Sequence, residues 1–81
     1  MLTAAQIKAA RALLDWSQPQ LAEAAKLSLP TISRMEGVLG PGRSTAANVE
    51  AVRRALEQGG VVFLGDGEPA HAGGPGVRLR S

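Results

Sequence analysis

Two short consecutive helices, predicted between residues 17 and 36, constrain the possible fold of this chain more than any other feature. The segment SQPQLAEAAKLSLPTISRME holds two helix starts separated by a three-residue joint. Helices this short share a core only if they cross steeply, so the pair predicts a helix-turn-helix unit. Such a pair commonly serves to place its second helix in the major groove of DNA. The flanking residues decide whether this use is supported.

One helix-start pattern recurs along the first third of the chain. Each time a hydroxyl residue follows an apolar residue, and a second apolar residue stands four positions further on. The hydroxyl accepts an orphan backbone N–H, and the two apolar side chains fix the angle at which the chain enters the helix. The capping residues are Thr3, Ser17 and Ser28. They predict helices over about residues 4–15, 18–25 and 29–36.

The second half of the chain predicts a loop, a fourth helix and then two strands. GVLGPGR predicts a loop, and an amphipathic helix follows over about residues 45–58, with Glu50 and Arg54 as an i,i+4 pair. Residues 61–64 and 77–80 have the composition of β-strands and flank a glycine-rich stretch. We therefore expect a mainly α chain with a short C-terminal two-stranded β element.

Composition excludes several classes of function. The 81-residue chain has no cysteine and a single histidine, which argues against disulfides and metal sites. His71 has no partner at a recurring spacing and no nucleophile–base set is present, so we expect neither an enzyme nor a cofactor. The chain lacks the roughly 20-residue apolar run of a membrane span and a signal-peptide pattern, which predicts a cytoplasmic protein without a membrane partner. Its net charge of +2 gathers between residues 26 and 54.

Residues 3–58 resemble the Cro and lambda-repressor-like helix-turn-helix family, often called the XRE family. The resemblance rests on AARxLLxWSQxxLAxxA from Ala9 and on SxxTISRME from Ser28, at the spacing of the family. It implies a compact bundle of four or five helices in residues 1–60. It also implies a transcriptional regulator, usually a repressor, that binds double-stranded DNA at a palindromic operator as a homodimer. Lys26 departs from the family, which often has glycine at this joint; either a strained residue or an altered turn would follow.

In this resemblance the helix at 29–36 reads the DNA. At about 100° per residue, its exposed side lies opposite Ile32 and Met35. Arg34 is the best candidate for a bidentate contact to guanine, worth roughly 1–3 kcal/mol, and a phosphate contact is the alternative. Leu29 stands where the family often has a polar amide, and it could touch a thymine methyl group instead.

Further DNA contacts are implied by matching family positions. Gln18 matches a side chain that contacts phosphate, although it could also be a solvated helix-start glutamine. Arg43 and Ser44 match a region that grips backbone phosphate, although an ordinary exposed loop is possible. The expected DNA-binding set is Gln18, Ser28, Leu29, Pro30, Thr31, Ser33, Arg34, Arg43 and Ser44. Arg11 and Glu36 match a structural ion pair between the first and third helices.

The tail of residues 61–81 is the expected dimerisation element. Its two strands carry apolar residues that a small domain has difficulty covering, so we expect them to pair or pack across a two-fold axis. The alternative is a tail folded onto its own helices in a monomer. The residues expected at the dimer interface are Val61, Val62, Phe63, Leu64, Val77 and Leu79. A second function also remains open, that of an antitoxin whose tail binds a partner protein and which represses its own operon.

Overall fold

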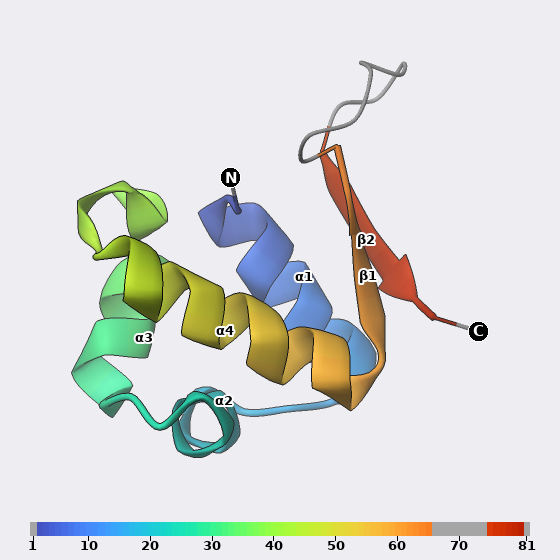
Figure 1. Ribbon diagram of the computed structural model, residues 1–81, viewed down its shortest axis with the longest axis horizontal. Helices are drawn as coiled ribbons and strands as arrows, with labels where there is room; N and C mark the ends of the chain where they lie inside the picture. The colour runs from blue at the N-terminus through green and yellow to red at the C-terminus, as the bar shows by residue number, and fades with distance from the viewer. Residues whose placement is uncertain (1, 66–74, 81) are drawn as a thin grey trace.

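The computed structural model describes residues 2–65 and 75–80. Within these residues the chain is mainly helical and ends in a two-stranded antiparallel sheet (Figure 1). The expected coarse fold class is therefore confirmed. In chain order the elements are α1 (Ala4–Leu14), α2 (Gln18–Ala25), α3 (Leu29–Met35), the 3-10 helix η1 (Gly40–Arg43), α4 (Ala46–Gly59), β1 (Val61–Leu64) and β2 (Gly76–Leu79).

Side-chain caps set the start of each α-helix. The hydroxyls of Thr3, Ser17 and Ser28 each accept the backbone N–H three residues on, as the sequence predicts. Thr45 does the same for α4 by accepting the N–H of Asn48. α1 and α3 end one residue earlier than expected, at Leu14 and Met35, and α4 is shifted by one residue at both ends, to Ala46–Gly59. In the first three helices the capping residue therefore fixes the start more sharply than the end.

The joint between α2 and α3 keeps a tight turn without glycine. Lys26 has φ 59 and ψ 42, in the left-handed region, and its N–H donates to the carbonyls of Ala22 and Glu23. A residue with a Cβ atom pays about 1–2 kcal/mol for this conformation. Of the two alternatives left by the sequence, the joint therefore has the strained residue.

The segment expected to be a plain loop between α3 and α4 contains η1. Gly40 turns the chain with φ 64, and Pro41 is buried against the protein. The N–H of Ser44 then donates to the Pro41 carbonyl at 2.9 Å and closes the helical turn. The loop prediction is wrong for residues 40–43, because a proline with a fixed φ suits the first positions of such a turn.

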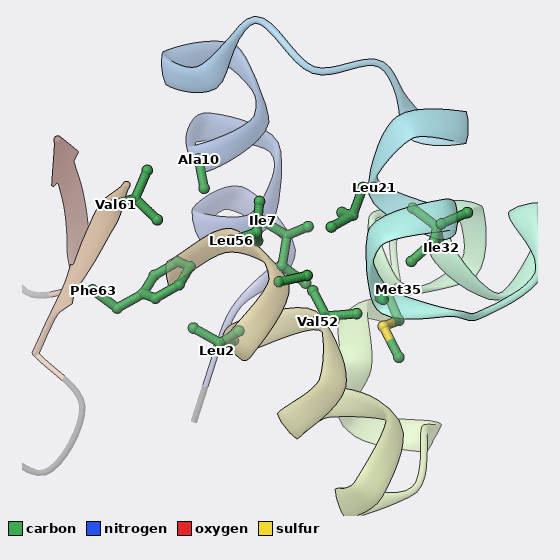
Figure 2. Packing of buried hydrophobic residues seen from close by; sticks show 13 residues of the cluster. Leu2, Ile7, Ala10, Leu21, Ile32, Met35, Val52, Leu56, Val61 and Phe63 are labelled. Atoms are coloured by element: carbon green, nitrogen blue, oxygen red, sulfur yellow. The ribbon is translucent and has the colours of Figure 1, made fainter. Parts of the chain in front are cut away.

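One hydrophobic core joins the helices and the sheet (Figure 2). Ile32 and Met35 of α3 are fully buried in it, as the helical spacing predicts. Val61 and Phe63 of β1 also point into this core, with exposed fractions of 1% and 8%. These two residues are therefore core residues of their own chain rather than a surface for a second copy, and the expectation that placed them at a dimer interface is wrong.

The hairpin pairs within a single chain and is tied to α1. Val61 lies opposite Leu79 and Phe63 opposite Val77, and the Arg80 N–H donates to the Gly60 carbonyl at 2.7 Å. The buried Gln6 side chain donates to the carbonyls of Leu64 and Gly76 at 3.2 and 3.0 Å and accepts from the Thr3 N–H at 2.9 Å. Gln6 thus connects the cap of α1 to both strands. The second strand begins one residue earlier than expected, at Gly76.

The sheet and α3 lie at opposite ends of the molecule. In Figure 1 the long axis, 34 Å in extent, runs from α3 on the left to the hairpin on the right, with α1 and α4 between them. The hairpin can therefore make contacts of its own without covering the surface of α3.

Candidate nucleic-acid interface

The exposed side of α3 carries the residues that sequence analysis assigned to DNA. Ser28, Leu29, Pro30, Ser33 and Arg34 are exposed, and Thr31 is half-buried. The hydroxyl of Ser28 accepts the Thr31 N–H at 3.3 Å and lies 2.8 Å from the Thr31 hydroxyl. Because Ile32 and Met35 anchor the opposite side of the helix in the core, this face is held in a fixed orientation.

Residues from two separate segments meet in a polar hollow of about 320 Å³ between α3, η1 and the start of α4. The fold brings Arg34 of α3 to the same hollow as Arg43 and Ser44, which follow nine and ten residues later. Thr45 and Asn48 at the start of α4 complete it; the Asn48 N–H is taken by the Thr45 hydroxyl, and the positive end of the helix dipole still favours an anion here. The polar hollow is lined by Thr31, Arg34, Leu39, Gly40, Arg43, Ser44, Thr45 and Asn48.

A second hollow lies on the other side of Arg34 and has an apolar lining. It includes Val38, which is fully exposed, and Leu39, which is 66% exposed. Sequence analysis missed both residues because they lie in the stretch treated as a loop. Two adjacent aliphatic residues between glycines were the available indication. The apolar hollow is lined by Pro30, Ser33, Arg34, Gly37, Val38 and Leu39.

The charges around both hollows are of one sign. Between residues 28 and 48 the basic residues are Arg34 and Arg43, and both are exposed. The one acidic residue in that range is Glu36, whose side chain is only 3% exposed and is paired. The surface formed by α3, η1 and the start of α4 therefore presents positive charge to solvent.

An ion pair between half-buried Arg11 and buried Glu36 links α1 to the residue that caps the end of α3. Arg11 of α1 donates through Nε and Nη2 to the two carboxylate oxygens of Glu36, both at 2.7 Å. A third Arg11 donor, Nη1, reaches the Trp16 carbonyl at 3.0 Å. The two side chains expected to pair do so, in the bidentate geometry that arginine and carboxylate favour.

The pair changes the protonation equilibrium of both groups. Burial alone would raise the pKa of Glu36, but hydrogen bonds from Arg11 and Gln18, with the charge of Arg11, hold this pKa below its usual value. The hydrogen bond to Glu36 likewise raises the pKa of Arg11 above its already high value, against the opposing effect of burial. Glu36 is therefore an acceptor in the folded protein over the whole neutral range.

Gln18 belongs to this network as well as to the surface. Its side chain is half-buried, and Nε2 donates to Glu36 Oε1 at 3.1 Å. An amide nitrogen has two hydrogens, so one donor is left for a second acceptor outside the protein. The simple alternative of a solvated glutamine is thus replaced by a side chain held in place by Glu36.

The remaining arginines of α4 and the hairpin make contacts within the protein. Arg53 lies 5.4 Å from the centroid of the Phe63 ring and pairs with Glu57 at 3.4 Å. Arg54 pairs with Glu50 at 3.0 Å, as the i,i+4 spacing predicts. In β2 and just after it, Arg78 donates to the Leu79 carbonyl and Arg80 to the Glu57 carbonyl. These cations are separate from the polar hollow.

The expected dimerisation residues divide into two groups. Val61 and Phe63 are buried, as described above, whereas Val62, Leu64 and Val77 are half-buried and Leu79 is 46% exposed. The last four leave apolar surface on the hairpin. His71 lies outside the described residues.

The described residues form neither a metal-binding cluster nor a membrane-spanning helix. No three His, Cys, Asp or Glu side chains within residues 2–65 and 75–80 are placed to hold a metal ion. In the same part of the chain, no helix has the length and apolar character needed to cross a membrane. No family model matches the chain, and no curated protein or solved structure is significantly similar to it.

Proposed function

We propose that this protein binds double-stranded DNA and regulates transcription, with α3 in the major groove of its operator. The helix pair α2 and α3 would then act as the helix-turn-helix of a lambda-repressor-like bundle. One observation carries the proposal: Arg34 of the reading helix and Arg43 of η1 flank the same polar hollow. In the proposal, a donor suited to base edges thus lies beside a donor suited to a backbone phosphate, the two kinds of contact that groove recognition combines.

Each residue of the interface has a separate task in this proposal. Arg34 donates to the O6 and N7 atoms of a guanine, while Arg43, Ser44 and the first turn of α4 hold a backbone phosphate. The free hydrogen on Gln18 Nε2 binds a second phosphate, with Glu36 fixing the amide. Phosphate contacts position the protein and base contacts supply the sequence preference.

Selection from random duplex DNA tests the proposal and yields the site, its symmetry and its half-site spacing. We expect one enriched motif with a guanine in each half-site. Arg34→Ala should then reduce binding to the enriched duplex by roughly 1–3 kcal/mol and to random DNA by much less. Arg43→Ala should weaken binding to both duplexes and lower the dependence of affinity on salt. Arg54→Ala, which removes the same charge from the remote Glu50 pair, is the control.

Two results would contradict parts of this proposal. A protein that enriches no motif and shows no salt-dependent affinity for duplex DNA is not a DNA-binding regulator. If Arg34→Ala weakens binding to the enriched and the random duplexes equally, Arg34 contacts a phosphate rather than a base. An equal effect of Arg54→Ala would show that net charge, rather than the polar hollow, controls binding.

The hairpin supports the homodimer part of the proposal. Leu79 is exposed on the face that it shares with Val61, and half-buried Val62 lies on the opposite face, so both faces of the hairpin leave apolar area at the end of the molecule away from α3. Because Val61 and Phe63 belong to the core, deleting the tail would unfold the protein and cannot test this role. Leu79→Ser should instead convert a dimer to a monomer in light scattering, whereas Val38→Ser at the other end should not. A Leu79→Ser protein of unchanged dimeric mass would exclude the hairpin as the interface.

The same surface supports the alternative of an antitoxin-type protein. An apolar hairpin remote from the DNA-binding face can hold a different chain while α3 remains available. Co-expression with the products of neighbouring genes distinguishes the two functions. A stable complex that depends on Leu79 favours the antitoxin, and a homodimer that binds palindromic DNA without a partner favours the plain regulator.

A further inference from the structure

We infer that the apolar hollow beside α3 recognises thymine methyl groups, so that each half-site pairs a guanine with a nearby thymine. This inference rests on the proposed DNA binding and names the bases that the same surface selects. It begins from Val38, a fully exposed aliphatic residue next to the reading helix. Exposed apolar surface beside a binding face commonly marks a contact.

The chemistry of this side of α3 excludes most hydrogen-bonded base reading. Pro30, which lines the apolar hollow, has neither a side-chain nor a backbone donor, and Val38 and Leu39 have no side-chain donor. Ser33 contributes one hydroxyl to the apolar hollow. The apolar group that B-DNA presents in its major groove is the C5-methyl of thymine, which apolar side chains contact directly. A methyl group therefore matches a surface of Pro30 and Val38 better than any polar base edge does.

The charges favour DNA over an apolar protein partner as the occupant. Arg34 and Leu39 line both the apolar and the polar hollow, and Arg43 lines the polar one. Between residues 28 and 48 no exposed carboxylate offsets these two arginines, because Glu36, the one acidic residue of that range, is buried and paired with Arg11. An apolar peptide would leave both arginines without counter-charges, whereas a polyanion with methyl groups in its groove satisfies the cations and the aliphatic residues together.

The spacing along α3 predicts where the thymine stands. Pro30 and Arg34 are one helical turn apart, which is about 6 Å along the helix axis. Successive base pairs are about 3.4 Å apart along one strand. The thymine should thus lie within about two base pairs of the guanine that Arg34 reads.

Deoxyuridine substitution isolates the methyl group. Each thymine of the enriched duplex is replaced in turn by deoxyuridine, which removes the methyl group and keeps every hydrogen-bonding group. We expect affinity to fall about threefold to fivefold at one or two positions near the guanine, as the loss of one buried methyl implies. In Val38→Ser and Leu39→Ser, which change the two aliphatic residues lining the apolar hollow, the ratio between thymine and deoxyuridine duplexes should approach one at those positions. Val38 is fully exposed, so its substitution does not disturb folding.

The outcomes separate this inference from the proposed function. Failure to enrich any duplex would refute DNA binding itself. Tight binding with equal affinities for thymine and deoxyuridine at every position would overturn the inference and leave DNA binding intact. A thymine preference that survives both Val38→Ser and Leu39→Ser would place the reading elsewhere. If Val38→Ser binds every duplex as the unmodified protein does, the apolar hollow belongs to a protein contact instead.

Discussion

The ion pair between Arg11 and Glu36 makes the stability of this domain unusually sensitive to one substitution. Glu36→Gln keeps the shape of the side chain but removes the charge that accepts two bonds from Arg11 and one from Gln18. Removing one member of a buried pair costs about 3–5 kcal/mol. Because the Arg11 side chain retains 20% of its exposure, water can partly solvate it, and we expect a loss of about 2–3 kcal/mol.

Urea unfolding followed by the fluorescence of Trp16, the single tryptophan, measures this loss. Glu50→Gln is the matched control, since it removes the same charge from an exposed pair with Arg54, where about 0.5 kcal/mol or less is at stake. Arg11→Met combined with Glu36→Leu should be more stable than the sum of the single losses predicts, since no buried charge is left alone. A Glu36→Gln loss no larger than that of Glu50→Gln would refute the reasoning.

The same pair sets the response to acid. The pKa of Glu36 is lower in the folded than in the unfolded protein, so its stabilisation is complete above the unfolded value of about 4.3. That stabilisation is lost as the pH falls through the lower, folded value. The stability difference between the unmodified protein and Glu36→Gln should therefore be constant at neutral pH and shrink below about pH 4. A difference that stays constant down to low pH would contradict this assignment.

Four further substitutions, one of them a control, test individual features of the fold. Gly59→Ala should destabilise by about 1–2 kcal/mol because its Cβ would lie 2.9 Å from the Trp16 ring, while Gly42→Ala, with open space, should be neutral or slightly stabilising. Lys26→Gly should raise thermal stability by about 0.5 kcal/mol, as it relieves a left-handed residue; an unchanged or lower Tm would contradict the strain. Gln6→Leu should cost about 2–4 kcal/mol and speed amide exchange in both strands, and unchanged exchange would show that the tether is dispensable.

Local chemistry made the helical part of this chain predictable from sequence. Thr3, Ser17 and Ser28 cap their helices because the cap depends on residues three or four positions away. The buried faces follow from helical spacing in the same way, as Ile32 and Met35 illustrate. The pairing of Arg11 with Glu36 came from resemblance rather than spacing, since nothing local connects residues on different helices.

Long-range packing explains what the sequence did not reveal. The capping pattern predicts the bond that the Gln6 side-chain oxygen accepts from Thr3. It does not predict the bond that the side-chain nitrogen of Gln6 donates to the Gly76 carbonyl, seventy residues away. Val61 and Phe63 were assigned to a dimer because apolar strand residues look the same whether their own helices or a second copy cover them. The hollows beside Arg34 arise because η1 packs against α3. The glycines and proline of GVLGPGR predict a break between helices but not the place where this segment packs.

Amide chemical shifts during a titration with duplex DNA test the central claim most directly, and they require no knowledge of the operator. The account predicts that shifts concentrate at Gln18 and in residues 28–34, 37–39 and 43–48, and that Val62 and Leu64 of the hairpin stay unchanged. Arg43→Ala should reduce the shifts at 43–48 first. Shifts centred on the hairpin, or none at all at low salt, would contradict the assignment of α3 and the polar hollow as the DNA-binding surface.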